Sequence, residues 1–208
     1  MSQKIAVIVF GYCNIGSITR VLGDLGASPF ACYGPRQLDD ADKIVLPGVG
    51  SFAAAMGSLH RMQMIDAIGQ HVTDLKKPFL GICLGMQLMA ECGVEGGQEC
   101  AGLGLVDGRV EKMIPTGRER IPHMGWNNVN YEVVSPLFSG IPDGRDFYFV
   151  HSYHVDTPTK EPLIASTPFA GGIASSIRGC HDRVWGVQFH PEKSQKFGQK
   201  LLQNFIAA

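Results

Sequence analysis

The sequence predicts an α/β fold: an open, mostly parallel, doubly wound sheet with an antiparallel C-terminal extension. Three observations predict it. In the first half, short apolar runs alternate with longer amphipathic segments, which is the order of strands and helices in a parallel sheet. These apolar runs lack polar alternation, as expected for strands buried on both faces. After residue 103, short runs joined by Gly and Pro follow one another as in hairpins.

The elements of the first half follow in chain order. Ile5–Phe10 is an apolar strand, and Asn14 is a suitable N-cap for a helix that ends near Gly26. Ser51 can cap a long segment, Phe52–Lys76, which we expect to be broken into helical pieces. Three more strands and one short helix complete this half: strands Pro29–Tyr33, Lys43–Leu46 and Phe79–Ile82, and helix Met86–Cys92.

The second half is expected to extend the same sheet with antiparallel strands. The candidate strands are Arg109–Ile114, Asn128–Val134, Phe147–Val150, Leu163–Ser166, Ile173–Arg178 and Val184–Phe189. Lys196–Ala208 is expected to close the chain as a helix with one apolar face, made by Phe197, Leu201, Leu202 and Phe205. Because 208 residues fit one domain and no linker or repeat interrupts them, residues 1–208 are expected to form a single domain.

Composition excludes several classes of protein. With 45% hydrophobic and 18% charged residues, the chain is neither disordered nor a polyelectrolyte. A net charge of −1 without any Lys/Arg block argues against nucleic acid as a partner. We find no export signal and no membrane-spanning run, so a cytoplasmic location is expected. The six cysteines form no C-x-x-C pair, which argues against a metal site and against a disulfide scaffold.

The strongest chemical motif is Gly81-Ile82-Cys83-Leu84-Gly85, which follows a buried strand and precedes a helix. This is the context of a nucleophile elbow, where flanking glycines permit a sharp turn and the helix N-terminus favours a thiolate. The alternative is an ordinary buried cysteine after an apolar strand. The motif alone leaves the two interpretations about equal.

A second motif supports the catalytic interpretation. His190-Pro191-Glu192 ends a late strand and places a histidine two residues before a carboxylate. A cysteine nucleophile needs a base, and the base needs an orienting acid. A histidine by itself at a strand end is more often a structural core residue. Together with the elbow, the order Cys, His, Glu on an α/β sheet favours catalysis.

A third motif, Leu46-Pro47-Gly48-Val49-Gly50-Ser51, also joins a strand to a helix. Glycine-rich turns of this kind can direct backbone N–H groups at a developing oxyanion. By itself the stretch could be an ordinary turn before an N-cap serine. Its place at a strand end, like that of Cys83, favours a ligand site because such sheets bind ligands there.

Together these motifs resemble the class I, triad-type glutamine amidotransferases, and more narrowly the glutaminase subunits of imidazole glycerol phosphate synthase. The resemblance covers nearly the whole chain and is carried by five segments: Leu46–Phe52, Gly81–Met89, Pro122–Asn127, Phe149–Tyr153 and Gly186–Ser194. It implies a single class I glutamine amidotransferase domain over residues 1–208 that hydrolyses glutamine without a metal or cofactor. It also implies a heterodimer with a cyclase/synthase subunit that uses the ammonia in histidine biosynthesis.

The resemblance assigns roles residue by residue. Cys83 is the expected nucleophile, His190 the acid/base and Glu192 the residue that orients it. Backbone groups expected at the oxyanion site belong to Gly48, Val49, Gly50 and Leu84. Residues expected to hold the substrate glutamine are Gln87, Glu95, Ser152 and Tyr153, and those expected to meet the partner are Asn14, Trp126 and Lys193.

One stretch departs from the family pattern and leaves alternatives open. Where the family commonly has D-Y-G-x-G-N, this chain has Val9-Phe10-Gly11-Tyr12-Cys13-Asn14. A paralogous glutaminase subunit that feeds another ammonia-dependent synthase, for example in surface-sugar amidination, is therefore an alternative. A cysteine peptidase or chaperone-like protein of related fold usually has His directly after its nucleophile, where this chain has Leu84. A catalytically dead interaction module is disfavoured because all three triad residues are intact.

Overall fold

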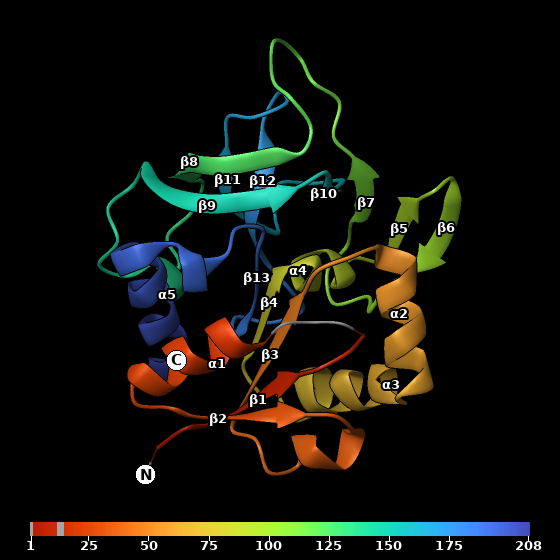
Figure 1. Ribbon diagram of the computed structural model, residues 1–208, viewed down its shortest axis with the longest axis vertical. Helices are drawn as coiled ribbons and strands as arrows, with labels where there is room; N and C mark the ends of the chain where they lie inside the picture. The colour runs from red at the N-terminus through yellow and green to blue at the C-terminus, as the bar shows by residue number, and fades with distance from the viewer. Residues whose placement is uncertain (1, 12–14) are drawn as a thin grey trace.

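The computed structural model describes residues 2–11 and 15–208, and that part of the chain contains a nine-stranded and a four-stranded sheet (Figure 1). The larger sheet is parallel in its first half and antiparallel in its second, which confirms the predicted α/β class with an antiparallel extension. In sheet order its strands are β2 (Ser28–Cys32), β1 (Lys4–Ile8), β3 (Lys43–Gly48), β4 (Phe79–Cys83), β13 (Val184–Val187), β12 (Ile173–Arg178), β11 (Leu163–Thr167), β8 (His123–Tyr131) and β9 (Arg145–His151).

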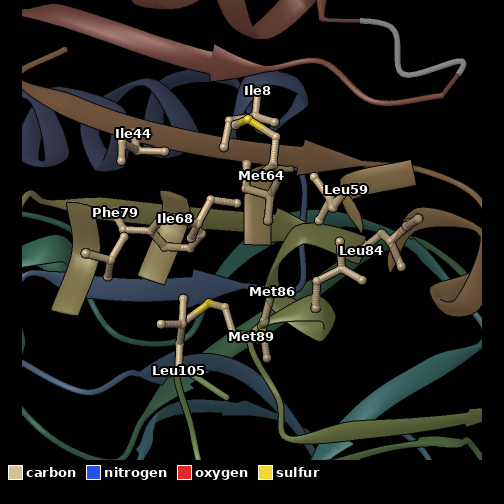
Figure 2. Close-up of a cluster of buried hydrophobic side chains, with 14 of the residues drawn as sticks. Ile8, Ile44, Leu59, Met64, Ile68, Phe79, Leu84, Met86, Met89 and Leu105 are labelled. Atoms are coloured by element: carbon tan, nitrogen blue, oxygen red, sulfur yellow. The ribbon is translucent and has the colours of Figure 1, made fainter. Parts of the chain in front are cut away.

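Helices cover both faces of the parallel half because its strands are apolar on both sides. In β1, Ile5 and Val7 pack into one core, whereas Ala6 and Ile8 pack into the other. The first core lies under α1 (Gly16–Asp24) and α5 (Gln195–Ala207) (Figure 1). The second lies under α2 (Phe52–Arg61), α3 (Met64–Gly69) and α4 (Leu84–Leu88), and part of it is drawn in Figure 2.

The structure confirms that the segment after β3 is broken into helical pieces. Local features explain where its first helix starts and where it is interrupted. The Ser51 side chain accepts a hydrogen bond from the Ala54 N–H at 3.4 Å and so caps α2. Gln63, with φ of +56°, separates α2 from α3, and a π-helical segment, Gln70–Asp74, follows. The predicted cap Asn14 lies outside the described residues, and Ile15 occupies the N-cap position of α1.

The predicted helix Met86–Cys92 is wrong at both ends. The helix, α4, begins at Leu84 and ends at Leu88, and Cys92 begins a strand, β5 (Cys92–Glu95). The helix stops because a following loop takes its carbonyl groups, as when the Leu103 N–H bonds to the Leu88 carbonyl at 2.8 Å. β5 then turns into β6 (Gln98–Ala101) through two glycines with positive φ, a hairpin signal that the sequence analysis overlooked.

Two expectations for the second half are also wrong. The predicted strand Arg109–Ile114 does not extend the main sheet. Its ordered part, β7 (Arg109–Lys112), pairs with β5 and β10 (Tyr153–Asp156) in the four-stranded sheet β10-β7-β5-β6. The second wrong expectation concerns the predicted strand Val184–Phe189, which was expected to belong to the antiparallel extension. It contributes β13, which is antiparallel to β12 but pairs parallel with β4. β13 is buried along its whole length, like the parallel strands β3 and β4.

Candidate active site

Cys83 lies on a strained turn between β4 and α4. Its φ is +55° and its ψ is −110°, a conformation rarely adopted outside glycine. A Cβ on Gly81 would lie 2.6 Å from the Gly85 carbonyl oxygen, and a Cβ on Gly85 would lie 1.7 Å from the Leu46 carbonyl oxygen. Only glycines fit these two places, so the flanking residues of the predicted elbow are required by backbone packing.

His190 and Glu192 form a hydrogen-bonded pair beside Cys83. The Nδ1 atom of His190 lies 2.8 Å from Oε1 of Glu192, and Pro191 opens the 3-10 turn that brings the carboxylate back to the ring. Burial disfavours the imidazolium, but hydrogen bonds and negative charge from Cys83 and Glu192 outweigh it and raise the pKa of His190 to about 9. The pair therefore favours a protonated imidazole next to the cysteine sulfur.

The other ring nitrogen of His190 faces the thiol side. Nε2 is buried, and within the described residues no hydrogen-bond partner for it meets ordinary geometric limits. Cys83 is nevertheless close enough to raise the pKa of His190. Long hydrogen bonds between a base and its nucleophile are common in sites without substrate and shorten when the substrate binds.

Ser194, which the sequence analysis did not single out, fixes the His190 backbone. It is 1% exposed; its hydroxyl donates to the His190 carbonyl at 2.6 Å and accepts from the Tyr148 N–H at 3.0 Å. The His190 N–H in turn donates to the Tyr148 carbonyl at 2.8 Å. The histidine is thus tied to β9, and no local sequence pattern signals this link.

A cavity of about 290 Å³ opens next to Cys83, near the lower end of the range for small-molecule sites. It is lined by Val49, Gly50, Cys83, Leu84, Gln87, Glu95, Val150, His151, Ser152 and Tyr153. The structure therefore brings all four predicted substrate residues to one cavity, with three of the four predicted oxyanion residues. Gly48 is not among the lining residues. It packs against one of them, since a Cβ added at Gly48 would lie 3.2 Å from the Leu84 Cβ.

Glu95 contributes negative charge to the cavity wall. Its Oε2 accepts the Phe52 N–H at the start of α2 at 2.6 Å, which holds the carboxylate in place across two elements. A fixed carboxylate at the edge of a small cavity attracts a cationic group, such as the α-ammonium of an amino acid. The charge and the size of the cavity both suit a free amino acid.

Two buried histidines lie at the wall formed by residues 150–153: His151 lines the cavity, and His123 contacts it. His123 and His151 are hydrogen-bonded to each other, Nδ1 to Nε2, at 3.0 Å. Burial lowers the pKa of His123 to about 4 and that of His151 to about 3, so both rings are neutral near pH 7. His123 also stacks between Phe149 and Phe169. Both histidines lie in segments that carry the family resemblance, but neither was assigned a role from the sequence.

The structure brings two of the three predicted partner residues together around Tyr148. The Trp126 ring packs edge-on to Tyr148 with centroids 6.0 Å apart, and Nζ of Lys193 lies 5.8 Å above the same ring. Trp126 is 48% exposed, and its neighbour Met124 is 63% exposed. The third predicted partner residue, Asn14, lies outside the described residues.

Two further findings concern the described part of the chain as a whole. Among residues 2–11 and 15–208, no group of three or more His, Cys, Asp or Glu side chains is arranged to hold a metal ion. In the same residues, no helix is long and apolar enough to cross a membrane. The residues that line the cavity include a thiol, that of Cys83, and a carboxylate, that of Glu95.

Comparison with known proteins identifies relatives over nearly the full length. Residues 27–208 match the family model described as "Glutamine amidotransferase class-I". The chain is 44% identical over 201 residues to imidazole glycerol phosphate synthase subunit HisH 1 of Campylobacter jejuni, covering 97% of this chain and 98% of that protein. It is 39% identical over 202 residues to subunit HisH 2 of Methanococcus maripaludis, with the same two coverages.

Solved structures share the fold at much lower identity. The PurLQS structure from Thermotoga maritima superposes with a TM-score of 0.79 at 18% identity, over 100% of this chain and 99% of that one. A protein from Thermoplasma acidophilum, described as a putative GMP synthase subunit, gives a TM-score of 0.74 at 21% identity, over 100% and 94% of the two chains. At such identities the likeness concerns the fold alone.

Proposed function

Because this chain belongs to the class I glutamine amidotransferases, within the HisH subunits of imidazole glycerol phosphate synthase, we infer that it is a glutaminase. It hydrolyses glutamine to glutamate and ammonia and supplies the ammonia for histidine biosynthesis. The observation that carries this proposal is that Cys83 and the Glu95 carboxylate line one cavity while the His190–Glu192 pair lies beside Cys83. Since this cavity draws residues from both halves of the chain, we propose that residues 1–208 act as one domain.

Each triad residue has a role that follows from its contacts. The Cys83 thiolate attacks the side-chain amide carbon of glutamine, and His190 gives its proton to the departing nitrogen, so ammonia leaves and a glutamyl thioester forms. His190 then takes a proton from water, which attacks the thioester and releases glutamate. Glu192 keeps Nδ1 of the ring occupied at 2.8 Å, so that Nε2 exchanges the proton.

The negative oxygen formed in each step needs hydrogen-bond donors. Val49, Gly50 and Leu84 line the cavity next to Cys83, and β3 and β4 are in register so that Gly48 lies opposite Cys83. We propose that backbone N–H groups of this loop and of Leu84 stabilise the oxyanion. One such donor is typically worth about 10²–10³ in rate.

We propose that a cyclase/synthase subunit covers the face around Trp126 and forms a heterodimer with this chain. Ammonia released in water is largely protonated near neutral pH and is then not nucleophilic. It must therefore reach its acceptor by a path that is shielded from solvent. Met124 and Trp126 are exposed apolar side chains on one strand, as at many interface cores. Lys193, held over Tyr148, lies one residue from Glu192 and links this face to the triad.

The test uses the purified chain together with its synthase subunit. We expect the complex to release glutamate from glutamine and Cys83→Ala to abolish that release, while cyclisation driven by ammonium salts persists. Cys180→Ala, which changes an exposed cysteine away from the cavity, is the matched control. Continued glutamate release by Cys83→Ala would contradict the mechanism. An active glutaminase that feeds a different synthase instead would support the paralogous alternative suggested by residues 9–14.

A further inference from the structure

Gln188 lies against the sulfur of Cys83. It belongs to the Gly186–Ser194 segment, but no role was assigned to it from the sequence. Its side chain is fully buried, and its Nε2 lies 3.7 Å from Sγ of Cys83. Its Oε1 accepts a hydrogen bond from Nε2 of Gln87 at 3.0 Å. A polar side chain inside the apolar run Val184–Phe189 is the one sequence signal that could have marked it.

The orientation of both amides follows from the partner at the far end. Nε2 of Gln87 lies 2.9 Å from the Tyr153 backbone carbonyl, which can only accept, so the nitrogen of Gln87 must point there. The second hydrogen on that nitrogen then donates to Gln188, which must present its oxygen to Gln87. The nitrogen of Gln188 is thereby turned toward Cys83, and this side chain is a donor to the sulfur.

The buried histidines continue this hydrogen-bond network beyond the Tyr153 carbonyl, and each of their hydrogen bonds has one defined direction. Nδ1 of His151 lies 2.8 Å from the Tyr153 carbonyl and must carry its proton there, so its Nε2 accepts from Nδ1 of His123. Nε2 of His123 in turn accepts from the Asn127 amide at 3.2 Å. Every donor meets an acceptor, which is possible only while both rings are neutral, as their lowered pKa values require.

A backbone carbonyl near the sulfur explains why a donor is needed. Sγ lies 3.9 Å from the Val150 backbone carbonyl, which suits an S–H group but repels a thiolate. Cys83 is only 6% exposed, so bulk water provides little compensation in the substrate-free site. Apart from His190, Gln188 supplies the positive end of a dipole at the sulfur.

We propose that Gln188 takes part in the reaction by donating its amide N–H to the Cys83 thiolate, which keeps the sulfur aimed into the cavity. The hydrogen bond weakens as the electron pair of the sulfur forms the bond to the glutamine carbon, and it returns when water displaces the sulfur from the thioester. This inference deepens the proposed function, since the reaction in question is the glutaminase reaction.

The first test measures the reactivity of the Cys83 sulfur and does not depend on glutaminase activity. Alkylation of Cys83 by iodoacetamide, followed by mass spectrometry of its peptide between about pH 5 and 9.5, reports thiolate reactivity. Gln188→Leu should shift this rate profile to higher pH by about one unit, because a charge-assisted donor is lost. Gln188→Glu should shift it further, because an acceptor with negative charge then faces the sulfur.

Ser176→Ala is the matched control. Ser176 is equally buried, and its hydroxyl donates to the Gly186 carbonyl at 3.0 Å in the neighbouring strand pair, without contact to the cavity. We expect its alkylation profile to coincide with that of the wild type. Thermal unfolding of each variant shows that the compared proteins are folded at the assay temperature.

The second test uses the complex with the synthase subunit. Gln188→Leu should lower kcat for glutamate release about tenfold while KM for glutamine changes less than about twofold, since Gln188 does not line the cavity and Gln87 keeps its bond to the Tyr153 carbonyl. Folded Gln188 variants with wild-type alkylation profiles would overturn the proposal, as would an equal shift in Ser176→Ala. A wild-type complex without glutaminase activity would instead overturn the proposed function and leave the alkylation result valid.

Discussion

Gly85→Ala tests whether close packing of α4 on β3 sets the position of Cys83. An alanine Cβ here would lie 1.7 Å from the Leu46 carbonyl oxygen and 2.8 Å from its carbonyl carbon, against an ordinary contact of 3.4–4 Å. Both atoms belong to the backbone of a fully buried strand, so no side chain can rotate out of the way. The helix must move off the strand and carry the Cys83 turn with it.

The expected loss of stability follows from the overlap of the alanine Cβ with backbone atoms. Overpacking a core typically costs about 1–3 kcal/mol, and an overlap with backbone belongs at the upper end or beyond. We expect the free energy of unfolding of Gly85→Ala to fall by about 3 kcal/mol and Tm by roughly 6–12 °C. Urea unfolding followed by circular dichroism measures this loss. Glutamate release by the complex, at a temperature where the variant is folded, should also fall because the nucleophile is displaced.

Gly23→Ala is the control for replacing a glycine by alanine. Gly23 lies in α1 with ordinary backbone angles, and outside its own helix backbone no described atom lies within 4 Å of the position that an alanine Cβ would take. Alanine there should raise the free energy of unfolding by about 0.5–1 kcal/mol, through its better helix propensity. A Gly85→Ala protein within about 0.5 kcal/mol of the wild type would refute the packing argument.

Three further predictions concern the groups around the triad. Since the pKa of His190 is raised from 6.5 to about 9, its stabilising contribution is complete below pH 6.5 and is lost as pH rises through about 9. Glu192→Gln should flatten this alkaline loss in urea unfolding, and an unchanged slope would contradict the pairing. Since the pKa values of His123 and His151 are lowered to about 4 and 3, stability should fall as pH drops below 6.5. His123→Phe should reduce that acid dependence between about pH 7 and 5, and an equal dependence in both proteins would disprove it. Ser194→Ala leaves the Tyr148 N–H without its acceptor and should cost about 1–3 kcal/mol and lower kcat, whereas wild-type values for both would show that the link to β9 is dispensable.

Much of the fold and part of the candidate site could be predicted because they depend on neighbours in the chain. Apolar runs without alternation marked β1, β3 and β4, and the Gly81–Gly85 elbow is a local backbone motif. The His190–Glu192 contact is likewise local, since two residues and one proline determine it. For these elements periodicity, turn chemistry and short spacing are sufficient physical causes.

Tertiary structure decided which of these elements meet. β13 pairs with β4, and this pairing, which no periodicity encodes, is what carries His190 to Cys83. Strand order also decided that β7 leaves the main sheet. Gln188 and Ser194 were missed for the same reason: their hydrogen bonds join segments far apart in the chain. A buried polar group must find its partner wherever the folded chain places one, so such contacts become visible only once the strands are assembled.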